Sequence, residues 1–321
     1  MKKIIMVLTA IALAASCSPQ FHLDFLGKAD IQEVILIRSA AKEKILVIDI
    51  EGTISALAST SALAREGDIL SQVYYRLERA AADPLVKAVI VRLETPGGEV
   101  TASDIVYHEI LKFKEKTKRP VVGLMMSVAA SGGYYIASAC DTIIAHPSTI
   151  TGSIGVISIF PNVESLFDKI GVKMNIIKSG GMKDAGSPFR SMTEDEKKSF
   201  QTIIEEYYGN FLSVVAAGRK NKMTLEELRP LADGRVYTAR QALGLNLIDG
   251  IGYFDSALKK TLSLAKLGEA QVIAYTYYPK TKTNIYAAGL KETKVLETGF
   301  ESWLPTLKSG FYYLWLPESQ K

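Results

Sequence analysis

Short runs of β-branched and aliphatic residues alternate, from Lys44 onward, with longer segments whose apolar residues recur every three or four positions. The runs predict buried strands, and the spaced segments predict amphipathic helices. The expected strands cover residues 44–54, 87–94, 120–127, 141–147, 153–159 and 172–180. The expected helices cover residues 66–82, 101–118, 129–139 after an initial turn, 163–170, 193–220, a stretch from 224, 238–244 and 253–267. Thr193 with Glu196, and Thr224 with Glu227, have the spacing of capping boxes at helix starts.

Strands that alternate with helices in this way indicate an α/β fold whose sheet is largely parallel. Ligands of such sheets bind beyond the carboxyl ends of the strands. Three glycine-rich turns, at 95–98, 130–133 and 180–187, each follow an expected strand. They would converge on one site if the strands are neighbours, although glycine also marks ordinary tight turns. The sequence leaves both interpretations open for each turn.

The first 17 residues have the pattern of a secretory signal rather than of a folded element. Two lysines precede an apolar run at 4–15 that is too short to span a bilayer, and small residues then lead to Cys17. This arrangement resembles a lipobox, in which cleavage exposes a cysteine that is lipidated; a plain secreted protein and an uncleaved anchor are the alternatives. We therefore expect an exported protein, held by lipid on Cys17 in the periplasm or at the outer face of the cytoplasmic membrane.

The rest of the chain divides into three parts by its pattern. Residues 18–43 are expected to form a tether and lead-in, and residues 44–270 the main domain. Residues 271–321 differ because they are rich in aromatic residues and interrupted by proline. Such a tail is typical of a strand with a packed extension, and it also suits a belt that faces a membrane or a partner.

The composition of the chain excludes several classes of function. With 48% hydrophobic and 22% charged residues, the chain is an ordinary globular protein. Its net charge is +4, but basic residues are interleaved with acidic ones, so the basic stripe of a nucleic-acid-binding protein is missing. Two cysteines and three widely spaced histidines have no metal-ligand spacing, and we expect no metal and no cofactor.

A serine lies among small residues in the segment AASGG, residues 129–133, where an expected strand meets an expected helix. Backbone N–H groups at a helix start lack intrahelical partners and favour negative charge. Ser131 is therefore a candidate nucleophile, with the N–H of Gly132 as an oxyanion donor. A serine at this position also suits a purely structural N-cap.

A serine nucleophile needs a base, and the chain offers few histidines. His22 lies near the tether, His108 within a charged helix and His146 before a proline. A lysine can replace histidine when burial lowers its pKa towards neutrality. Lys183 is the candidate because its loop contains glycine, methionine and alanine, although a solvated surface lysine would also fit this context.

Five motifs occur together in a fixed order: TPGG at 95–98, AASGGYY at 129–135, TGSIGV at 151–156, SGGMKDAGSP at 179–188 and DGRVYTARQALGLNLID at 233–249. With these motifs the chain resembles the bacterial signal peptide peptidase A family of Ser/Lys S49 peptidases, in its short, single-repeat form. The resemblance covers about residues 44–270. It implies the ClpP/crotonase-like α/β fold, with repeated ββα units and an added helical region.

The resemblance also implies roles for individual residues. Ser131 matches the family's nucleophile, and Lys183 matches its general base. Ser153, in the TGS motif, matches the serine that orients the lysine. The oxyanion hole of this fold uses the N–H after the nucleophile, Gly132 here, and a glycine of the TPGG turn, for which we favour Gly98.

The function implied is that of a serine endopeptidase that degrades signal peptides left in the membrane after preprotein processing. Members of the family assemble as rings, so we expect a homo-oligomeric ring, with an octamer as the favoured size. A neighbouring subunit is expected to help build each site. Peptide substrates and the membrane are the expected partners, and nucleic acid is not. Two alternatives remain: a crotonase-like acyl-CoA enzyme, which the export signal argues against, and a non-catalytic scaffold or chaperone of the same fold at the membrane surface.

Overall fold

The computed structural model describes residues 31–56, 69–276, 284–285 and 311–315. The chain divides into two units, Met1–Ile31 and Gln32–Lys321, and the helices and strands below belong to the second. The expected signal segment, with Cys17, and His22 lie outside the described residues. Of the helices in the described ranges, none is long and apolar enough to cross a membrane.

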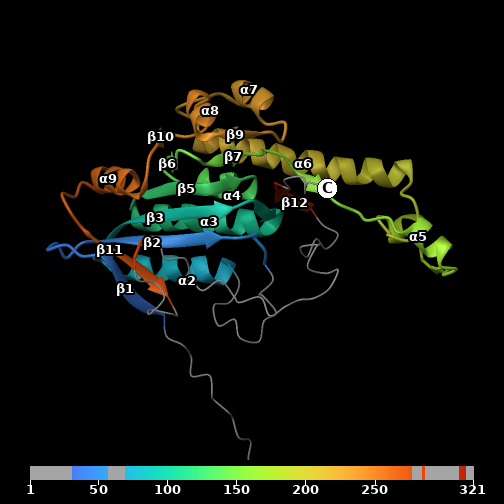
Figure 1. Cartoon of the computed structure of the whole chain (residues 1–321), viewed down its shortest axis with the longest axis horizontal. Helices are drawn as coiled ribbons and strands as arrows, with labels where there is room; N and C mark the ends of the chain where they lie inside the picture. The colour runs from blue at the N-terminus through green and yellow to red at the C-terminus, as the bar shows by residue number, and fades with distance from the viewer. Residues whose placement is uncertain (1–30, 57–68, 277–283, 286–310, 316–321) are drawn as a thin grey trace, which may run out of the picture. The chain divides into compact units, whose positions relative to one another are not determined.

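A nine-stranded sheet forms the centre of the second unit, and most of its neighbouring strands run parallel (Figure 1). Its main path has the order β1-β11-β2-β3-β5-β6-β10, with β7 paired to β5 and β9 paired to β7. Within the described sheet, the β1–β11 and β7–β9 pairs are antiparallel. The strands are β1 (Gln32–Ile37), β2 (Lys44–Glu51), β3 (Val86–Thr95), β5 (Val121–Ala130), β6 (Thr142–Ala145), β7 (Ile150–Gly152), β9 (Val236–Thr238), β10 (Gly250–Ile251) and β11 (Gln271–Thr276).

The central strands β2, β3 and β5 are continuous apolar runs because both of their faces are buried. On one face, residues such as Ile45 and Ile90 share a core with Phe254 of helix α9 (Phe254–Ala265). Alternate residues of a strand point to the opposite face, and there Leu46 and Val89 are fully buried as well. The sheet is therefore the core of the unit and a rigid platform for the turns at its edge.

Helices connect the strands and cover the sheet (Figure 1). Helix α2 packs beside α3, and α9 packs over β3 and β5. Helix α6 is the longest of the described helices, and its buried apolar residues, Phe211, Leu212 and Val215, lie in its C-terminal half. The helices other than α9 are α2 (Ile69–Ala82), α3 (Val100–Thr117), α4 (Gly132–Ala137), α5 (Glu164–Lys169), α6 (Glu194–Gly218), α7 (Leu225–Leu228), α8 (Ala239–Gly244) and the 3₁₀ helices η2 (Gly181–Asp184) and η3 (Arg229–Leu231).

A second, three-stranded sheet joins segments from distant parts of the sequence. Its strands are β4 (Gly97–Glu99), β12 (Phe311–Leu314) and β8 (Ile157–Ser158), in that spatial order. Strand β12 lies between the other two and runs antiparallel to both. A segment near the C-terminus is thus hydrogen-bonded beside the TPGG turn.

The α/β fold class is confirmed, and so are most of the predicted elements, including the capping boxes at Thr193 and Thr224. Two strand predictions are wrong. Residues 153–159 do not form one strand, because Ser153 has a left-handed backbone that separates β7 from β8. Residues 172–180 alternate in polarity but pair with no strand in the described chain, and Ile177 is fully exposed. Strand β1 was not predicted, since its partner β11 is distant in sequence.

Candidate active site

Ser131 lies at the junction where β5 ends and α4 begins. Its backbone has φ 51° and ψ −113°, a conformation outside the common regions for L-residues that costs about 1–3 kcal/mol. Its hydroxyl is buried and, within the described part of the chain, is the one buried side-chain oxygen or nitrogen without a hydrogen-bond partner. The hydroxyl makes no N-cap bond either, so the structural interpretation of this serine is not supported. A strained turn that presents an unpaired hydroxyl is the arrangement expected of a nucleophile.

Ser153 is brought beside Ser131 by the pairing of β5 with β7. The register places Ala130 opposite Gly152, and the N–H of Ser131 donates to the carbonyl of Gly152 at 2.7 Å. Ser153 follows directly, is buried, and is fixed by its own N–H, which donates to the carbonyl of Arg235 at 2.8 Å. Its left-handed φ of 49° is a second strained backbone at the same edge of the sheet.

Two glycine backbones meet directly beside Ser131. Gly97 has φ 102°, and a Cβ on it would lie 2.7 Å from the backbone nitrogen of Gly132. A Cβ on Gly132 would in turn lie 2.4 Å from Ser103 Oγ. Only glycine allows the TPGG turn and the start of α4 to approach so closely. The turns at 95–98 and 130–133 therefore converge on one place, as the sequence pattern had suggested.

The backbone of Gly98 faces strand β12. The backbone groups of its neighbours in β4, Gly97 and Glu99, bond to Ile54 on the opposite side of the strand. There the N–H of Ile54 donates to the carbonyl of Gly97 at 2.9 Å, and the N–H of Glu99 donates to the carbonyl of Ile54 at 2.8 Å. Backbone groups of successive residues in a strand point in opposite directions. The N–H and carbonyl of Gly98 therefore point towards β12, whose register places Tyr313 opposite.

The carbonyl oxygen of Tyr313 lies against the two glycine turns. A Cβ on Gly97 would lie 2.0 Å from this oxygen, and a Cβ on Gly132 would lie 3.1 Å from it. Beyond β12 the N–H of Trp315 donates to the carbonyl of Pro96 at 2.8 Å, which extends the same ladder. One peptide carbonyl of the chain thus occupies the place where the backbone of Gly98 and the turn before α4 meet.

The side chain of Tyr313 fills an aromatic pocket next to this carbonyl. Its ring stacks on Tyr135, with centroids 5.0 Å apart, and lies against Phe211 at 4.6 Å. Its hydroxyl donates to the carbonyl of Tyr207 at 2.9 Å, and burial raises its pKa. The hydroxyl of Tyr135 donates to Asp104 at 2.7 Å, which fixes the ring that forms one wall. The pocket is therefore apolar, with one acceptor at its end.

Lys183 lies on η2 and is exposed, in contrast to Ser131. Its side chain makes no hydrogen bond or ion pair with the residues that the structure describes. The described chain therefore places Ser131, Gly132, Gly98 and Ser153 together, and Lys183 makes no hydrogen bond to the buried hydroxyl.

Comparison with known proteins places the chain in a family. The sequence profile of peptidase family S49 matches residues 113–268, which include Ser131, Ser153 and Lys183. A protein of Enterococcus faecium named as a signal peptide peptidase SppA is 35% identical over 85% of this chain and 77% of its own length. The chain belongs to peptidase family S49.

Two further relatives extend this result. A protein of Synechocystis named as a protease is 36% identical to this S49 peptidase over 73% of the chain and 79% of its own length. Protease 4 of Haemophilus influenzae is 34% identical over 78% of this chain and 40% of its own length. Family membership and the parallel-rich sheet together carry the ClpP/crotonase-like fold and the assignment as a serine peptidase.

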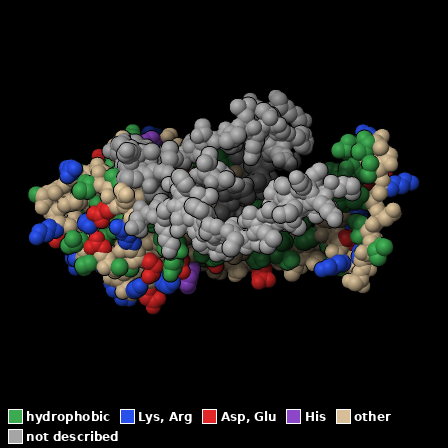
Figure 2. Space-filling model, turned by 90° about the horizontal axis from the view of Figure 1, so that it is seen from below, with side chains coloured by type: hydrophobic (Ala, Val, Ile, Leu, Met, Phe, Trp, Pro, Cys, Tyr) green, Lys and Arg blue, Asp and Glu red, His purple; other side chains and the backbone are tan. Residues whose placement is uncertain are grey.

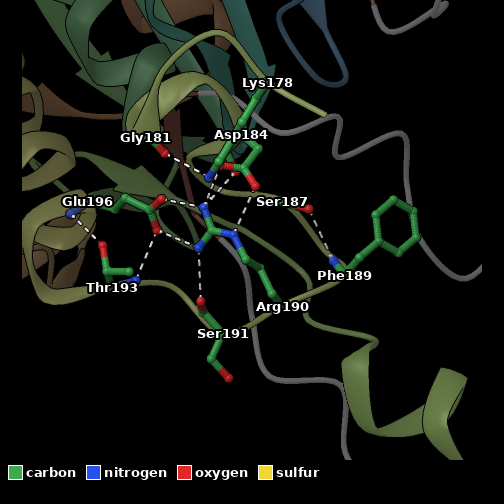
Figure 3. Close-up of polar contacts among 9 residues, drawn as sticks. All are labelled: Lys178, Gly181, Asp184, Ser187, Phe189, Arg190, Ser191, Thr193 and Glu196. Carbon is green, nitrogen blue, oxygen red and sulfur yellow. Dashed lines mark hydrogen bonds and ion pairs between the residues drawn. The ribbon is translucent and has the colours of Figure 1, made fainter. Parts of the chain in front are cut away.

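The loop of residues 178–191, which carries Lys183 in this S49 peptidase, is held by a network of charges (Figure 3). The Nε and Nη2 atoms of Arg190 donate to the two carboxylate oxygens of Asp184 at 3.0 and 2.8 Å, and its Nη1 donates to Glu196 at 3.0 Å. The ammonium of Lys178 pairs with the same Asp184. The hydrogen bonds from Arg190, and then the one from Lys178, hold the pKa of Asp184 well below its usual range. The hydrogen bonds from Arg190 also lower the pKa of Glu196 to about 2.

The other candidate residues lie away from this arrangement. His146 shares a hydrogen bond of 2.8 Å with Ser148 and packs its ring against Tyr253, and neither contact involves Ser131. Cys140 is buried, and burial raises the pKa of its thiol to about 12, so it is not a nucleophile at neutral pH. In the described ranges no group of three or more His, Cys, Asp or Glu side chains is arranged to hold a metal ion.

Sequence reasoning missed two contributors to the site. Tyr313 belongs to an aromatic tail whose partner strand could not be predicted, because β4 is only three residues long and distant in sequence. Arg190 lies in a mixed-charge stretch that is typical of a solvated surface. The spacing of Asp184, Arg190 and Glu196, six residues at each step, was the available signal.

Proposed function

We propose that this S49 peptidase is a Ser/Lys endopeptidase at a membrane surface, which degrades signal peptides that remain after preprotein processing. Ser131 is the nucleophile, Lys183 the general base, Ser153 the residue that orients this lysine, and Gly132 and Gly98 the oxyanion donors. The observation that carries the proposal is strand β12. It is a peptide in extended form whose carbonyl lies at the glycine turns beside an unpaired serine hydroxyl.

The chemistry follows from that placement. The Oγ of Ser131 attacks the carbonyl carbon of a bound peptide while neutral Lys183 accepts the hydroxyl proton. The N–H groups of Gly132 and Gly98 stabilise the oxyanion that forms, an effect typically worth about 3–4 kcal/mol for one donor. Lys183 returns the proton to the leaving amine, and water activated by the same lysine then releases the acyl group from Ser131.

A second copy of the chain is proposed to supply the lysine. The support is that Ser131 has no partner in its own chain as described and that Lys183 is exposed. The segment that carries Lys183 also exposes many apolar side chains; they gather, coloured green, at the right-hand end in Figure 2, where Figure 1 shows α5. These side chains are Leu166, Ile170, Val172, Met174, Ile176, Ile177 and Met182. Such a surface is typical of an interface between subunits, and a closed ring, for example an octamer, would bury it.

The pocket of Tyr313 indicates which peptides would bind. It accepts a large apolar or aromatic side chain on the acyl side of the cleaved bond, and its floor is made by Tyr135 and Phe211. Signal peptides are rich in such residues, and an extended segment can add to β4 and β8 as β12 does. Lipid on Cys17 would keep the enzyme at the membrane where these peptides remain.

The experiment that tests the proposal is hydrolysis of an internally quenched apolar peptide by the full chain in mild detergent. Wild type is compared with Ser131→Ala, Lys183→Ala and Ser153→Ala, each checked for its fold and assembly. We expect the first two variants to lose at least about a thousandfold in kcat, and Ser153→Ala to lose less. If Ser131→Ala and Lys183→Ala cleave as fast as wild type, the proposed catalytic pair is wrong.

Two further measurements test the surroundings of the site. When inactive Ser131→Ala and Lys183→Ala subunits are assembled together in equal amounts, random neighbours would restore about a quarter of wild-type activity if the site is shared. No recovery would place both residues in one chain. For the membrane, Cys17→Ala is expected to leave the membrane fraction after a carbonate wash, and continued attachment would show that lipid is not the anchor.

A further inference from the structure

Lys183 is carried by the short 3₁₀ turn η2, whose first residue, Gly181, accepts a hydrogen bond from Lys178 Nζ at 2.9 Å. A Cβ on Gly180 or on Gly181 would find no atom within 4 Å, so the turn does not pack closely at these positions. The side chain of Lys183 makes no hydrogen bond or ion pair within the described chain. A general base must be held close to its productive position, because a displacement of about 1 Å costs on the order of a hundredfold in rate. The turn therefore needs an anchor outside itself.

Arg190 provides this anchor at the residue that follows Lys183. Its guanidinium holds both carboxylate oxygens of Asp184, and its Nη2 also donates to the backbone carbonyl of Asp184 at 3.2 Å. Figure 3 shows the guanidinium between Asp184 and Glu196, with the Lys178 ammonium between Gly181 and Asp184. A planar guanidinium that makes several bonds at once fixes both distance and orientation, which a lysine cannot do.

The other end of the contact is the first turn of α6. Glu196 accepts from Arg190 Nη1 at 3.0 Å and from the N–H of Thr193 at 2.9 Å, where it completes the capping box. Only 1% of Glu196 is exposed, so this carboxylate is buried together with its hydrogen-bond partners. Further along the same helix, Phe211 contacts Tyr135 close to the nucleophile turn. A continuous rigid element thus connects the core near Ser131 with the loop of Lys183.

We propose that Arg190 is a positioning residue of this peptidase: by joining Asp184 to Glu196, it sets the place and the charge surroundings of Lys183. The proposal rests on the proposed function, because Lys183 is the general base named there. It adds a residue that touches neither the substrate nor the reacting atoms and acts only through the turn that carries the base.

The four charges of the Arg190 network sum to zero. Lys178 and Arg190 contribute two positive charges, and Asp184 and Glu196 contribute two negative ones. Without Arg190, one net negative charge would remain beside Lys183 and would favour its protonated form. Outside this network, Ser191 Oγ donates to Glu164 of α5 at 2.9 Å, so one further negative charge contacts the loop and is the same in every variant below. We expect the acid limb of the pH–rate profile to move up by roughly half a unit to one unit.

The test separates the effect of Arg190 on the position of Lys183 from its effect on the charge around Lys183. Steady-state kinetics of the assembled full chain are measured on one quenched peptide over a range of pH. Arg190→Gln is expected to lower kcat by about 10–100-fold, to leave KM within about twofold, and to raise the acid limb. Arg190→Lys keeps the positive charge but loses the planar guanidinium. We therefore expect kcat to be as low as in Arg190→Gln, while the acid limb of the pH–rate profile keeps its wild-type position. In the double variant Arg190→Gln with Glu196→Gln the charges of the network balance again. The acid limb of the pH–rate profile should then return to its wild-type position, while kcat remains low. Glutamine at this position still completes the capping box.

Lys197→Gln is the matched control. Lys197 pairs with Glu194 on the exposed surface of the same first turn, so the variant removes one positive charge without touching the network of Arg190. We expect its kcat, KM and pH profile to equal those of wild type. If Lys197→Gln moves the acid limb as far as Arg190→Gln does, the effect is one of net charge alone, and the proposed role of Arg190 is wrong.

The remaining outcomes are decisive in the same way. If Arg190→Gln unfolds or fails to assemble, Asp184→Asn replaces it; this variant should lower kcat and move the limb to lower pH, because a negative charge beside Lys183 is lost. Wild-type kcat and profile in a folded Arg190→Gln or Asp184→Asn overturn the inference, provided Lys183→Ala is inactive. If Lys183→Ala is itself fully active, the proposed function has failed instead.

Discussion

Replacing Tyr313 by alanine is expected to release β12 from its place between β4 and β8. Only 1% of Tyr313 is exposed, and its ring is held between Tyr135 and Phe211. Removing a buried aromatic side chain costs about 3–5 kcal/mol, and the bond from its hydroxyl to the carbonyl of Tyr207 contributes about 1 kcal/mol. A loss of about 3 kcal/mol, at the low end of this range, lowers the bound population of the strand about 150-fold.

This change should appear in the affinity for added peptide. Under the proposed function substrate binds where β12 lies, so β12, as part of the same chain, would compete with it at a fixed effective concentration. The apparent KM for a quenched apolar peptide should therefore fall by up to about a hundredfold in Tyr313→Ala, with kcat little changed. Tyr313→Phe keeps the ring and loses only the hydroxyl bond, so its KM should fall about fivefold.

Controls separate this effect from damage to the fold. Tyr313→Ala combined with Ser131→Ala must be inactive, which excludes a contaminating peptidase. Circular dichroism and the melting temperature show whether the remaining core is intact. A Tyr313→Ala enzyme that is folded and has a KM within twofold of wild type would refute the reasoning, because the strand would then not compete with substrate.

Four other predictions follow from the same geometry. Ser131→Gly should abolish hydrolysis and yet raise the melting temperature by about 1–3 °C, because it removes a strained φ of 51° and an unpaired buried hydroxyl; a lower value by calorimetry would contradict this. Gly97→Ala should lower kcat by at least about a hundredfold, since its Cβ would lie 2.7 Å from the first nitrogen of α4; a near-normal rate would show that the turn can move. Asp249→Ala should cost about 3–5 kcal/mol in chemical denaturation, because it leaves the buried guanidinium of Arg219, bound through two contacts of 2.9 Å, without its partner; a loss under 1 kcal/mol would argue against that pair. Glu196 has a pKa of about 2 in the folded chain against about 4.3 when unfolded. The contribution of its ionised form to the free energy of unfolding is therefore complete above the unfolded pKa and is lost as the pH falls towards 2. The difference in the free energy of unfolding between wild type and Glu196→Gln should close over that pH range, and a difference that persists at pH 2 would oppose the assignment.

The sequence predicted the fold wherever local pattern and tertiary packing agree. The buried runs that became β2, β3 and β5 are apolar on both faces, and the capping boxes are complete within four residues, so each signal is local. Residues 172–180 show the limit of this reasoning. Their alternation predicts a strand, but a strand also needs a partner, and the described chain provides none.

The same distinction applies to the site. Ser131 and the glycine turns at 95–98 and 130–133 could be predicted because the carboxyl ends of parallel strands meet at one edge of the sheet. The position of Lys183 relative to Ser131 could not, since its loop follows residues 172–180, which pair with no strand in the described chain. Tyr313 and Arg190 act through partners that are distant in sequence or that resemble ordinary surface charges, and no local pattern distinguishes them.

Strand β11 has a consequence for how the protein is made. It is inserted between β1 and β2, where residues 271–274 pair with residues 44–47. On the ribosome, β2 therefore has an open edge until residues 271–276 have been synthesised, and non-local pairing of this kind folds slowly. A fragment that ends at residue 268, where the match to the family profile ends, would leave the apolar strand KILVIDIE without this neighbour and prone to aggregate. The smallest part of the chain that folds by itself is thus expected to extend beyond the residues that the family profile matches.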